Sequence, residues 1–454
     1  MKFKIYMRSL FLLFFSSITG CTKANETQEW PTTLKMKDIG VVQTHFDFSF
    51  NKQENTFFAE SPKGSDKLIL GGMKAGVARL FNKKLEGGSL IKIQKGEIKG
   101  DSLKGVMTTM FGNFYFRAVK TNDRIEGKLL NGKKETVGLF NSDLNLKIKK
   151  KDYKAIWNDI EKITQDKIYN RSVLDSKKWQ SFKKQMDNSC KKFRDDLEFL
   201  MGFYYFSNDL GFSHYSAFIA WEDWDKHIKS QTTDLSHKFL DSDTYYLKIS
   251  SFSGTSEDMN KVLDQVAQKQ FKNLVIDLRD NSGGSIEAGM TFAERLVKQD
   301  IVGGVFLTRK YYNTKNSLPT KQELNQYDVF SKANYELLLK GISEKEGIVL
   351  KVEAKNTIPY QKLYFLVNQK TASTCEPILQ GFKENKMAII IGEKSAGKML
   401  NAEEFKIRDG YTLFLPTAMY VTSQGKVLDQ IGVEPNILVK EELSEDIILK
   451  YIKN

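Results

Sequence analysis

The feature that most constrains the fold of this chain is a change of hydrophobic pattern after residue 240. From there on, short apolar runs such as "TYYLKISSFS" and "NLVIDLRD" alternate with amphipathic segments such as "SEDMNKVLDQVAQKQ" and "EPILQGFKENK". Strand and helix patterns that alternate in this way are typical of a layered α/β core with crossover helices. The sequence therefore predicts an α/β domain over residues 241–454.

Two other patterns precede this core. Residues 40–148 consist of short alternating apolar runs broken by Gly, Asn and Asp turns, which predict a small all-β barrel or sandwich. Residues 149–240 carry apolar side chains at helical spacing with charges on the opposite face, and we expect them to form a helical subdomain. A length of 454 residues is compatible with two or three such domains.

The first residues, "MKFKIYMRSLFLLFFSSITGC", combine a basic start with an apolar run too short to span a bilayer. This pattern predicts a signal peptide over residues 1–20. The run ends in I-T-G-C, which resembles a bacterial lipobox, so we expect acylation of Cys21, a lipid-anchored linker over residues 21–39 and a place in the bacterial cell envelope. An unlipidated secretory signal and a short anchor are the alternatives. No later segment is apolar enough to cross a membrane.

Composition argues against several classes of function. The net charge of +13 is spread as lysine over the whole chain without an arginine-aromatic stripe, so we do not expect nucleic-acid binding. Cys190 and Cys375 lack the CxxC spacing of a zinc site, and nothing in the sequence supports a bridge between them. We expect no metal ion and no organic cofactor.

The stretch "QKTASTCEPILQGF" places Ser373 where a strand ends and a helix begins. Read as S-T-C-E, it is a capping box in which Ser373 caps the helix and Glu376 reaches back. A serine at a helix N-terminus also has backbone N–H groups beside it, which can stabilise a developing oxyanion. The local pattern fits both a helix cap and a nucleophile.

Two other strand ends carry suggestive residues. After "NLVID" comes "LRDNSGGS", in which Gly283 and Gly284 let the backbone pass close to a ligand and present N–H groups. After "IIIGEK" comes a short segment that ends in Lys398. Because binding sites of layered α/β folds lie past the C-terminal ends of strands, we expect Lys398 close to Ser373 if the two strands are neighbours.

Taken in order, five segments resemble motifs of the S41 family of serine peptidases, which includes C-terminal processing (tail-specific) proteases and tricorn-like core enzymes. The five segments are "YYLKISSFSG", "VIDLRDNSGGS", "LVNQKTASTCE", "IIIGEKSAGK" and "LPTAMYVTSQGKVLDQIGVEPNI". The resemblance covers roughly residues 150–440 and is strongest over residues 245–437. It implies a crotonase-like α/β core preceded by the helical subdomain.

The resemblance also implies roles for individual residues. Ser373 would be the nucleophile, and the backbone N–H groups of Gly283, Gly284 and Thr374 would stabilise the oxyanion. A serine hydroxyl needs a base within hydrogen-bond reach. Lys398 follows Ser373 at the spacing that the Ser-Lys dyad of the processing proteases implies, but a lysine base must be desolvated to be neutral.

His214, in "NDLGFSHYSAF", is the second candidate base. It resembles the Ser-His element of the tricorn-like branch, in which Ser213 would be the extra serine and Asp429 the acid, and such a Ser-His-Asp set is chemically complete. About thirty residues separate His214 from Tyr245, which is too few for the PDZ domain that processing proteases insert there. The sequence thus favours His214 as the base and keeps Lys398 as its rival or as a residue on the substrate side.

These inferences predict a membrane-tethered serine endopeptidase that cleaves unfolded chains or peptides. Two alternatives remain from the sequence, since one scaffold supports many activities. One is a non-catalytic lipoprotein that binds peptides, and the other is a hydrolase of non-peptide esters or amides that uses the same serine. The sequence leaves the oligomeric state open.

Overall fold

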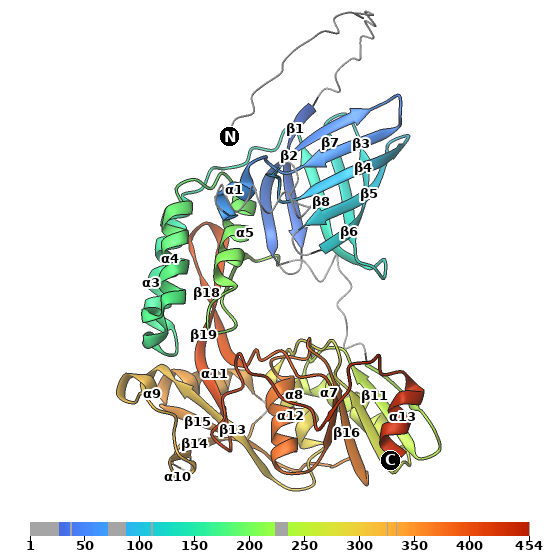
Figure 1. Cartoon of the computed structure of the whole chain (residues 1–454), viewed down its shortest axis with the longest axis vertical. Coiled ribbons are helices and arrows are strands. Elements are labelled where there is room, and N and C mark those ends of the chain that lie inside the picture. Colours follow the sequence, from blue (N-terminus) through green and yellow to red (C-terminus); the bar gives the residue numbers. More distant parts are fainter. Residues whose placement is uncertain are drawn as a thin grey trace, which may run out of the picture.

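The computed structural model describes residues 27–36, 39–70, 88–109, 112–222, 235–324, 326–332 and 334–453. The predicted signal peptide and the predicted lipidation site at Cys21 lie outside these residues. Figure 1 shows a barrel at one end of the molecule and an α/β core at the other, with a helical region and a long hairpin between them. None of the helices in the described ranges is long and apolar enough to cross a membrane.

Eight strands form a closed antiparallel barrel. Each strand pairs with its neighbours in the sequence, and β1 pairs with both β2 and β8. The strands are β1 (Thr27–Met36), β2 (Gly40–Asn51), β3 (Thr56–Glu60), β4 (Lys92–Lys99), β5 (Ser102–Thr109), β6 (Gly112–Lys120), β7 (Arg124–Leu130) and β8 (Thr136–Asp143). A short helix, α1 (Ser65–Leu70), follows β3. Of the barrel and the sandwich that the sequence allowed, the structure shows the barrel.

Strand β1 corrects the predicted linker over residues 21–39. Residues 27–36 read as polar, yet every second side chain from Trp30 to Met36 points inward and is buried. The inward Thr32 hydroxyl is hydrogen-bonded to the Ser142 hydroxyl at 2.6 Å, so its burial leaves no polar group unsatisfied. Alternation, rather than overall polarity, was the informative signal in this segment.

The segment predicted to be helical contains three α-helices. They are α3 (Tyr153–Lys167), α4 (Lys177–Ser189) and α5 (Asp196–Ser207), with the 3₁₀-helix η2 (Arg171–Asp175) between the first two. Each α-helix starts at a side-chain cap, and the caps are Asp152, Ser176 and Asp195. Their buried aromatic rings pack edge to face, as Trp157 and Phe182 do at 5.4 Å.

The core contains a six-stranded sheet in which every pair except the antiparallel β10–β11 pair is parallel. In spatial order its strands are β10 (Leu235–Phe239), β11 (Thr244–Ile249), β12 (Asn273–Asp277), β16 (Lys362–Val367), β17 (Ile389–Gly392) and β20 (Ile437–Leu438). Helices α7 (Ser256–Ala267), α8 (Ile286–Glu294) and α12 (Cys375–Glu384) pack on one face, and α13 (Glu445–Lys453) packs on the other. The predicted layered α/β arrangement is confirmed.

A second sheet joins the core to the barrel. Its core strands are β13 (Ile301–Thr308), β14 (Asp328–Phe330), β15 (Gly347–Val352), β18 (Leu400–Lys406) and β19 (Tyr411–Thr422), and its short helices are α9 (Arg309–Thr314), α10 (Lys321–Leu324) and α11 (Tyr335–Glu344). The long strand β19 pairs with β13 near its end and with β9 (Ser216–Ile219) near its start. Strand β9 also meets β2 of the barrel, so one sheet runs from the barrel into the core.

Candidate active site

Ser373 lies in the turn between β16 and α12. Its backbone has a φ of 55°, a left-handed conformation that is unfavourable for residues other than glycine. The Ser373 N–H donates to Glu376 Oε2 at 3.1 Å, as a capping box requires, but no side chain caps the start of α12. The Ser373 hydroxyl instead faces His214, with 3.5 Å between Oγ and Nε2. Of the predicted capping box, only the hydrogen bond to the Glu376 carboxylate forms, and the Ser373 hydroxyl does not cap the helix.

Glu376 brings the segment that ends in Lys398 beside this turn. Its buried carboxylate accepts hydrogen bonds from the Ser395 hydroxyl at 2.6 Å and from the Gly397 and Lys398 N–H groups at 2.7 and 2.8 Å. Burial raises the pKa of Glu376, although these hydrogen bonds oppose the shift. The carboxylate therefore ties two loops together.

His214 is linked to Asp429 through Ser213. The Ser213 hydroxyl donates to Asp429 Oδ1 at 2.5 Å and lies 2.7 Å from His214 Nδ1. Because that hydroxyl has one proton and gives it to the carboxylate, it accepts from His214 Nδ1–H. The tautomer that follows leaves His214 Nε2 as an acceptor facing Ser373. In place of the expected direct Ser-His-Asp set, the structure has a chain of four residues in which Ser213 lies between His214 and Asp429.

The surroundings keep the His214 imidazole neutral near pH 7. Burial, together with the smaller effect of the nearby positive charge of Lys398, lowers its pKa to about 4. Burial raises the pKa of Asp429, while hydrogen bonds from Ser213 and from the Met399 N–H oppose that shift. A neutral imidazole is the form that can accept a proton from serine.

Lys398 lies in a different environment. It is an exposed residue, and within the described ranges no hydrogen bond joins its side chain to Ser373. A lysine base needs desolvation to be neutral, and an exposed ammonium group does not have it. The geometry favours His214 over Lys398 as the partner of Ser373.

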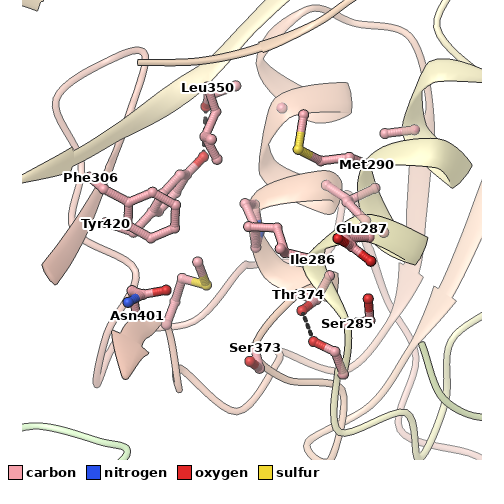
Figure 2. A pocket seen from close by; sticks show the side chains of 18 of the residues that line it. Ser285, Ile286, Glu287, Met290, Phe306, Leu350, Ser373, Thr374, Asn401 and Tyr420 are labelled. Carbon is pink, nitrogen blue, oxygen red and sulfur yellow. Dashed lines mark hydrogen bonds between the residues drawn. The ribbon is translucent and has the colours of Figure 1, made fainter. Parts of the chain in front are cut away.

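The two glycines of "NSGG" differ in their hydrogen bonds. The Gly283 N–H donates to Asn281 Oδ1 at 2.8 Å, so it is not free for an oxyanion, which corrects its expected role. Gly283 serves close packing instead, because a Cβ at its φ of 99° would lie 2.6 Å from Ser373 Cβ. The Gly284 and Thr374 N–H groups donate to no acceptor in the described part of the chain. The Thr374 hydroxyl donates to the Gly284 carbonyl at 2.8 Å and holds these two turns together (Figure 2).

A pocket of about 390 Å³ opens beside Ser373 (Figure 2). Its walls are mainly apolar and come from α8, β13, β15, α12, β18 and β19; they include Met290, Phe306, Leu350, Ile378 and Tyr420. Sequence reasoning missed this pocket, because its lining residues look like ordinary core positions in six separate elements. It also missed Asn281, whose amide is fully buried and donates to the Ile249 carbonyl at 2.9 Å.

The two cysteines considered in the sequence analysis lie in the protein interior. Cys190 and Cys375 are both free and buried, and burial raises the pKa of both thiols. Across the described residues, no group of three or more His, Cys, Asp or Glu side chains is arranged to hold a metal ion.

Comparison with known proteins agrees with the motifs. Residues 243–439 match the model of "Peptidase family S41". "Carboxyl-terminal-processing peptidase 3, chloroplastic" of Arabidopsis thaliana is 24% identical over 197 residues, which are 43% of this chain and 31% of that protein. "Carboxyl-terminal-processing protease" of Synechocystis sp. is 25% identical over 199 residues, which are 44% of this chain and 38% of that protein. The match thus spans less than two fifths of either relative.

The chain is also similar to solved structures. One of them is described as "Structure of a lipoprotein from Streptococcus agalactiae". The similarity has a TM-score of 0.46 with 16% sequence identity, and it covers 68% of this chain and 99% of that chain.

Proposed function

Residues 243–439 of this chain belong to peptidase family S41, and from that premise we propose that the protein is a serine endopeptidase with Ser373 as its nucleophile. The observation that carries the proposal is the contact of 3.5 Å between Ser373 Oγ and His214 Nε2. Both residues have left-handed backbones, with φ of 55° and 59°. Such strain in two facing polar residues is typical of a functional site.

In the proposed reaction, Ser373 Oγ attacks the carbonyl carbon of the scissile peptide bond while His214 Nε2 takes its proton. The imidazolium that forms is stabilised by Asp429 through the Ser213 hydroxyl, which keeps its own proton toward the carboxylate. The negative charge that develops on the carbonyl oxygen is stabilised by the N–H groups of Gly284 and Thr374. His214 then protonates the leaving amine, and a water molecule releases the acyl group from Ser373.

The pocket beside Ser373 supports a preference for an apolar side chain next to the scissile bond. Apolar walls gain free energy from burying such a side chain, while a charged one would lose its hydration there. Strand β18 contributes Leu400, Asn401 and Ala402 to the pocket and, among the described strands, pairs only with β19. Its other edge is suited to an extended substrate that adds as a strand.

We further propose that the enzyme acts in the bacterial cell envelope on unfolded polypeptides. The basic and apolar start of the chain and the I-T-G-C sequence at Cys21 support export and lipid attachment. The crotonase-like description of the core also remains part of this proposal.

The test is cleavage of a denatured protein by the chain from residue 22 onward, compared with its Ser373→Ala variant. We expect the parent to cleave and the variant to lose activity by at least about 1,000-fold, because the nucleophile is gone while the fold is kept. Matched circular dichroism spectra check the fold. Equal rates for parent and variant would contradict the proposal.

A further inference from the structure

The barrel meets the catalytic core at a seam that lies close to His214. Strand β9, which begins two residues after His214, pairs Ile219 with Tyr411 of β19 on one side. On its other side Ile219 meets Gly40 of β2. Gly40 has a φ of 74°, and a Cβ there would lie 1.7 Å from the Ile219 carbonyl oxygen. The backbones of barrel and core are therefore in direct contact at the strand that follows His214.

A second contact joins the barrel to the first turn of α5. The Thr44 hydroxyl of β2 donates to Asp195 Oδ2 at 2.6 Å, and the Gln43 N–H donates to Asp196 Oδ2 at 3.3 Å. Both carboxylates are buried, with exposed fractions of 3% and 2%. A buried carboxylate depends on its donors, and the N-terminus of α5 adds further stabilisation. The barrel thus supplies one hydrogen-bond donor to each of these two carboxylates.

One of these two acids, Asp196, also reaches the core and the helical region. Asp196 Oδ1 accepts from the Tyr411 hydroxyl at 2.6 Å, and Asp196 Oδ2 accepts from Lys151 Nζ at 3.0 Å. From this junction α5 leads to the segment that carries His214 (Figure 1). On the far side of His214, the Tyr215 hydroxyl is hydrogen-bonded to the Thr164 hydroxyl of α3 at 2.9 Å.

His214 is thus held between a core anchor and a barrel anchor. Ser213 fixes it to Asp429 of the core, and β9 fixes the residues that follow it to the seam with the barrel. Its left-handed backbone is strained, and a strained conformation persists only where its surroundings determine it from several sides. We propose that docking of the barrel positions the His214 base, with Thr44 and Gly40 as the positioning residues on the barrel side. This inference rests on the proposed function.

The expected size of the effect follows from the contact that the barrel supports. The 3.5 Å between Ser373 Oγ and His214 Nε2 is at the upper limit of a hydrogen bond. A displacement of about 1 Å would break it, and misplacements of that size lower rates by about 100-fold. Loosening the seam should therefore slow chemistry at Ser373 while the apolar walls of the pocket stay in place.

The test measures the rate at which a fluorophosphonate labels Ser373 in the full chain. This reagent reacts only with an activated serine, so the test can be made without knowing the substrate. Thr44→Val removes the hydroxyl at the seam. Thr32→Val is its matched control, since Thr32 is equally buried in the barrel and also loses a hydroxyl hydrogen bond, to Ser142. We expect labelling to slow at least about tenfold in Thr44→Val and less than about twofold in Thr32→Val. Thr44→Ser should restore the parent rate.

A pH profile separates positioning from general damage. In the parent, labelling should lose half its rate near pH 4, where the partly buried His214 becomes protonated beside Lys398 and the Ser213–Asp429 pair. In Thr44→Val the midpoint should move up toward about 6.5, the value of a hydrated histidine. If Thr44→Val does not fold, Tyr411→Phe loosens the same junction by removing the hydroxyl that binds Asp196 and should shift rate and midpoint in the same directions.

The outcomes are distinguishable. A parent that is never labelled would overturn the proposed function and this inference with it. A labelled parent with an unchanged Thr44→Val rate and midpoint would overturn the positioning role alone. Equal slowing in Thr44→Val and Thr32→Val would also overturn it, because the loss would then come from the barrel's stability.

Discussion

The barrel interior and the turn around Ser373 are both buried, but they are built in opposite ways. Inside the barrel, aromatic rings pack edge to face, with Phe140 at 5.2 Å from Phe46 and 5.1 Å from Phe116. Around Ser373, a strained backbone faces a strained His214, and two N–H groups have no acceptor in the described chain. Many similar contacts contribute to the stability of the barrel. The site, in contrast, depends on a few groups, each of which must keep its exact position.

The largest effect on stability should come from the barrel. Phe140→Ala removes a ring that is 1% exposed, and we expect a loss of about 3–5 kcal/mol in the free energy of unfolding. Urea denaturation measures it. Tyr115→Ala, which truncates a half-exposed ring on the outside of the barrel, should cost less than about 1 kcal/mol. If Phe140→Ala also abolished Ser373 labelling while the chain is folded, the site would depend on the packing of the whole barrel and not on a few groups of its own.

At the site, a small change should harm chemistry more than stability. Gly283→Ala places a Cβ 2.6 Å from Ser373 Cβ at a φ of 99°, so Ser373 or its turn must move. We expect labelling of Ser373 to slow by about 100-fold, with a loss of about 1–3 kcal/mol in stability. Gly132→Ala, in an exposed turn where a Cβ meets nothing within 4 Å, is the control. A normal labelling rate in Gly283→Ala would show that the turn tolerates displacement.

The smallest effect should follow removal of the rival base. Lys398→Ala takes away a positive charge that lowers the pKa of His214, so that pKa should rise from about 4. A protonated imidazole cannot accept a proton, so activity falls as the pH drops through this pKa, and the variant should lose activity at a higher pH than the parent. At pH 7 we expect labelling within about threefold of the parent. A complete loss at pH 7 would favour Lys398 as the base.

The sequence predicted the parts of the molecule that local patterns determine. Alternation revealed the strands and helices of the core, and the motif around Ser373 placed that residue at a strand-to-helix joint, where the structure has it. The barrel was expected as a barrel or a sandwich, because alternation identifies strands but not how a sheet closes. Strand β1 was assigned to a linker, because its outward residues are polar and one inward position is the buried Thr32.

The finer geometry of the site depends on contacts that are distant in the sequence. Gly283 and Gly284 look equivalent in "NSGG", and only the position of the Asn281 side chain decides which N–H is occupied. Ser213 could be expected near His214, its neighbour in the sequence. Its place between His214 and Asp429 depends on how two loops meet that are more than 200 residues apart in the sequence, at positions 213 and 429. The seam at Gly40 has no local signal, since a glycine at the start of a strand usually marks a turn.

The proposed role of His214 is to activate Ser373. The most direct measurement is mass spectrometry of the full chain after reaction with a fluorophosphonate at pH 7, in the parent and in His214→Gln. We expect one adduct on Ser373 in the parent and labelling at least about 100-fold slower in His214→Gln, whose side chain cannot take the proton. Equal labelling of Ser373 in both proteins would contradict it.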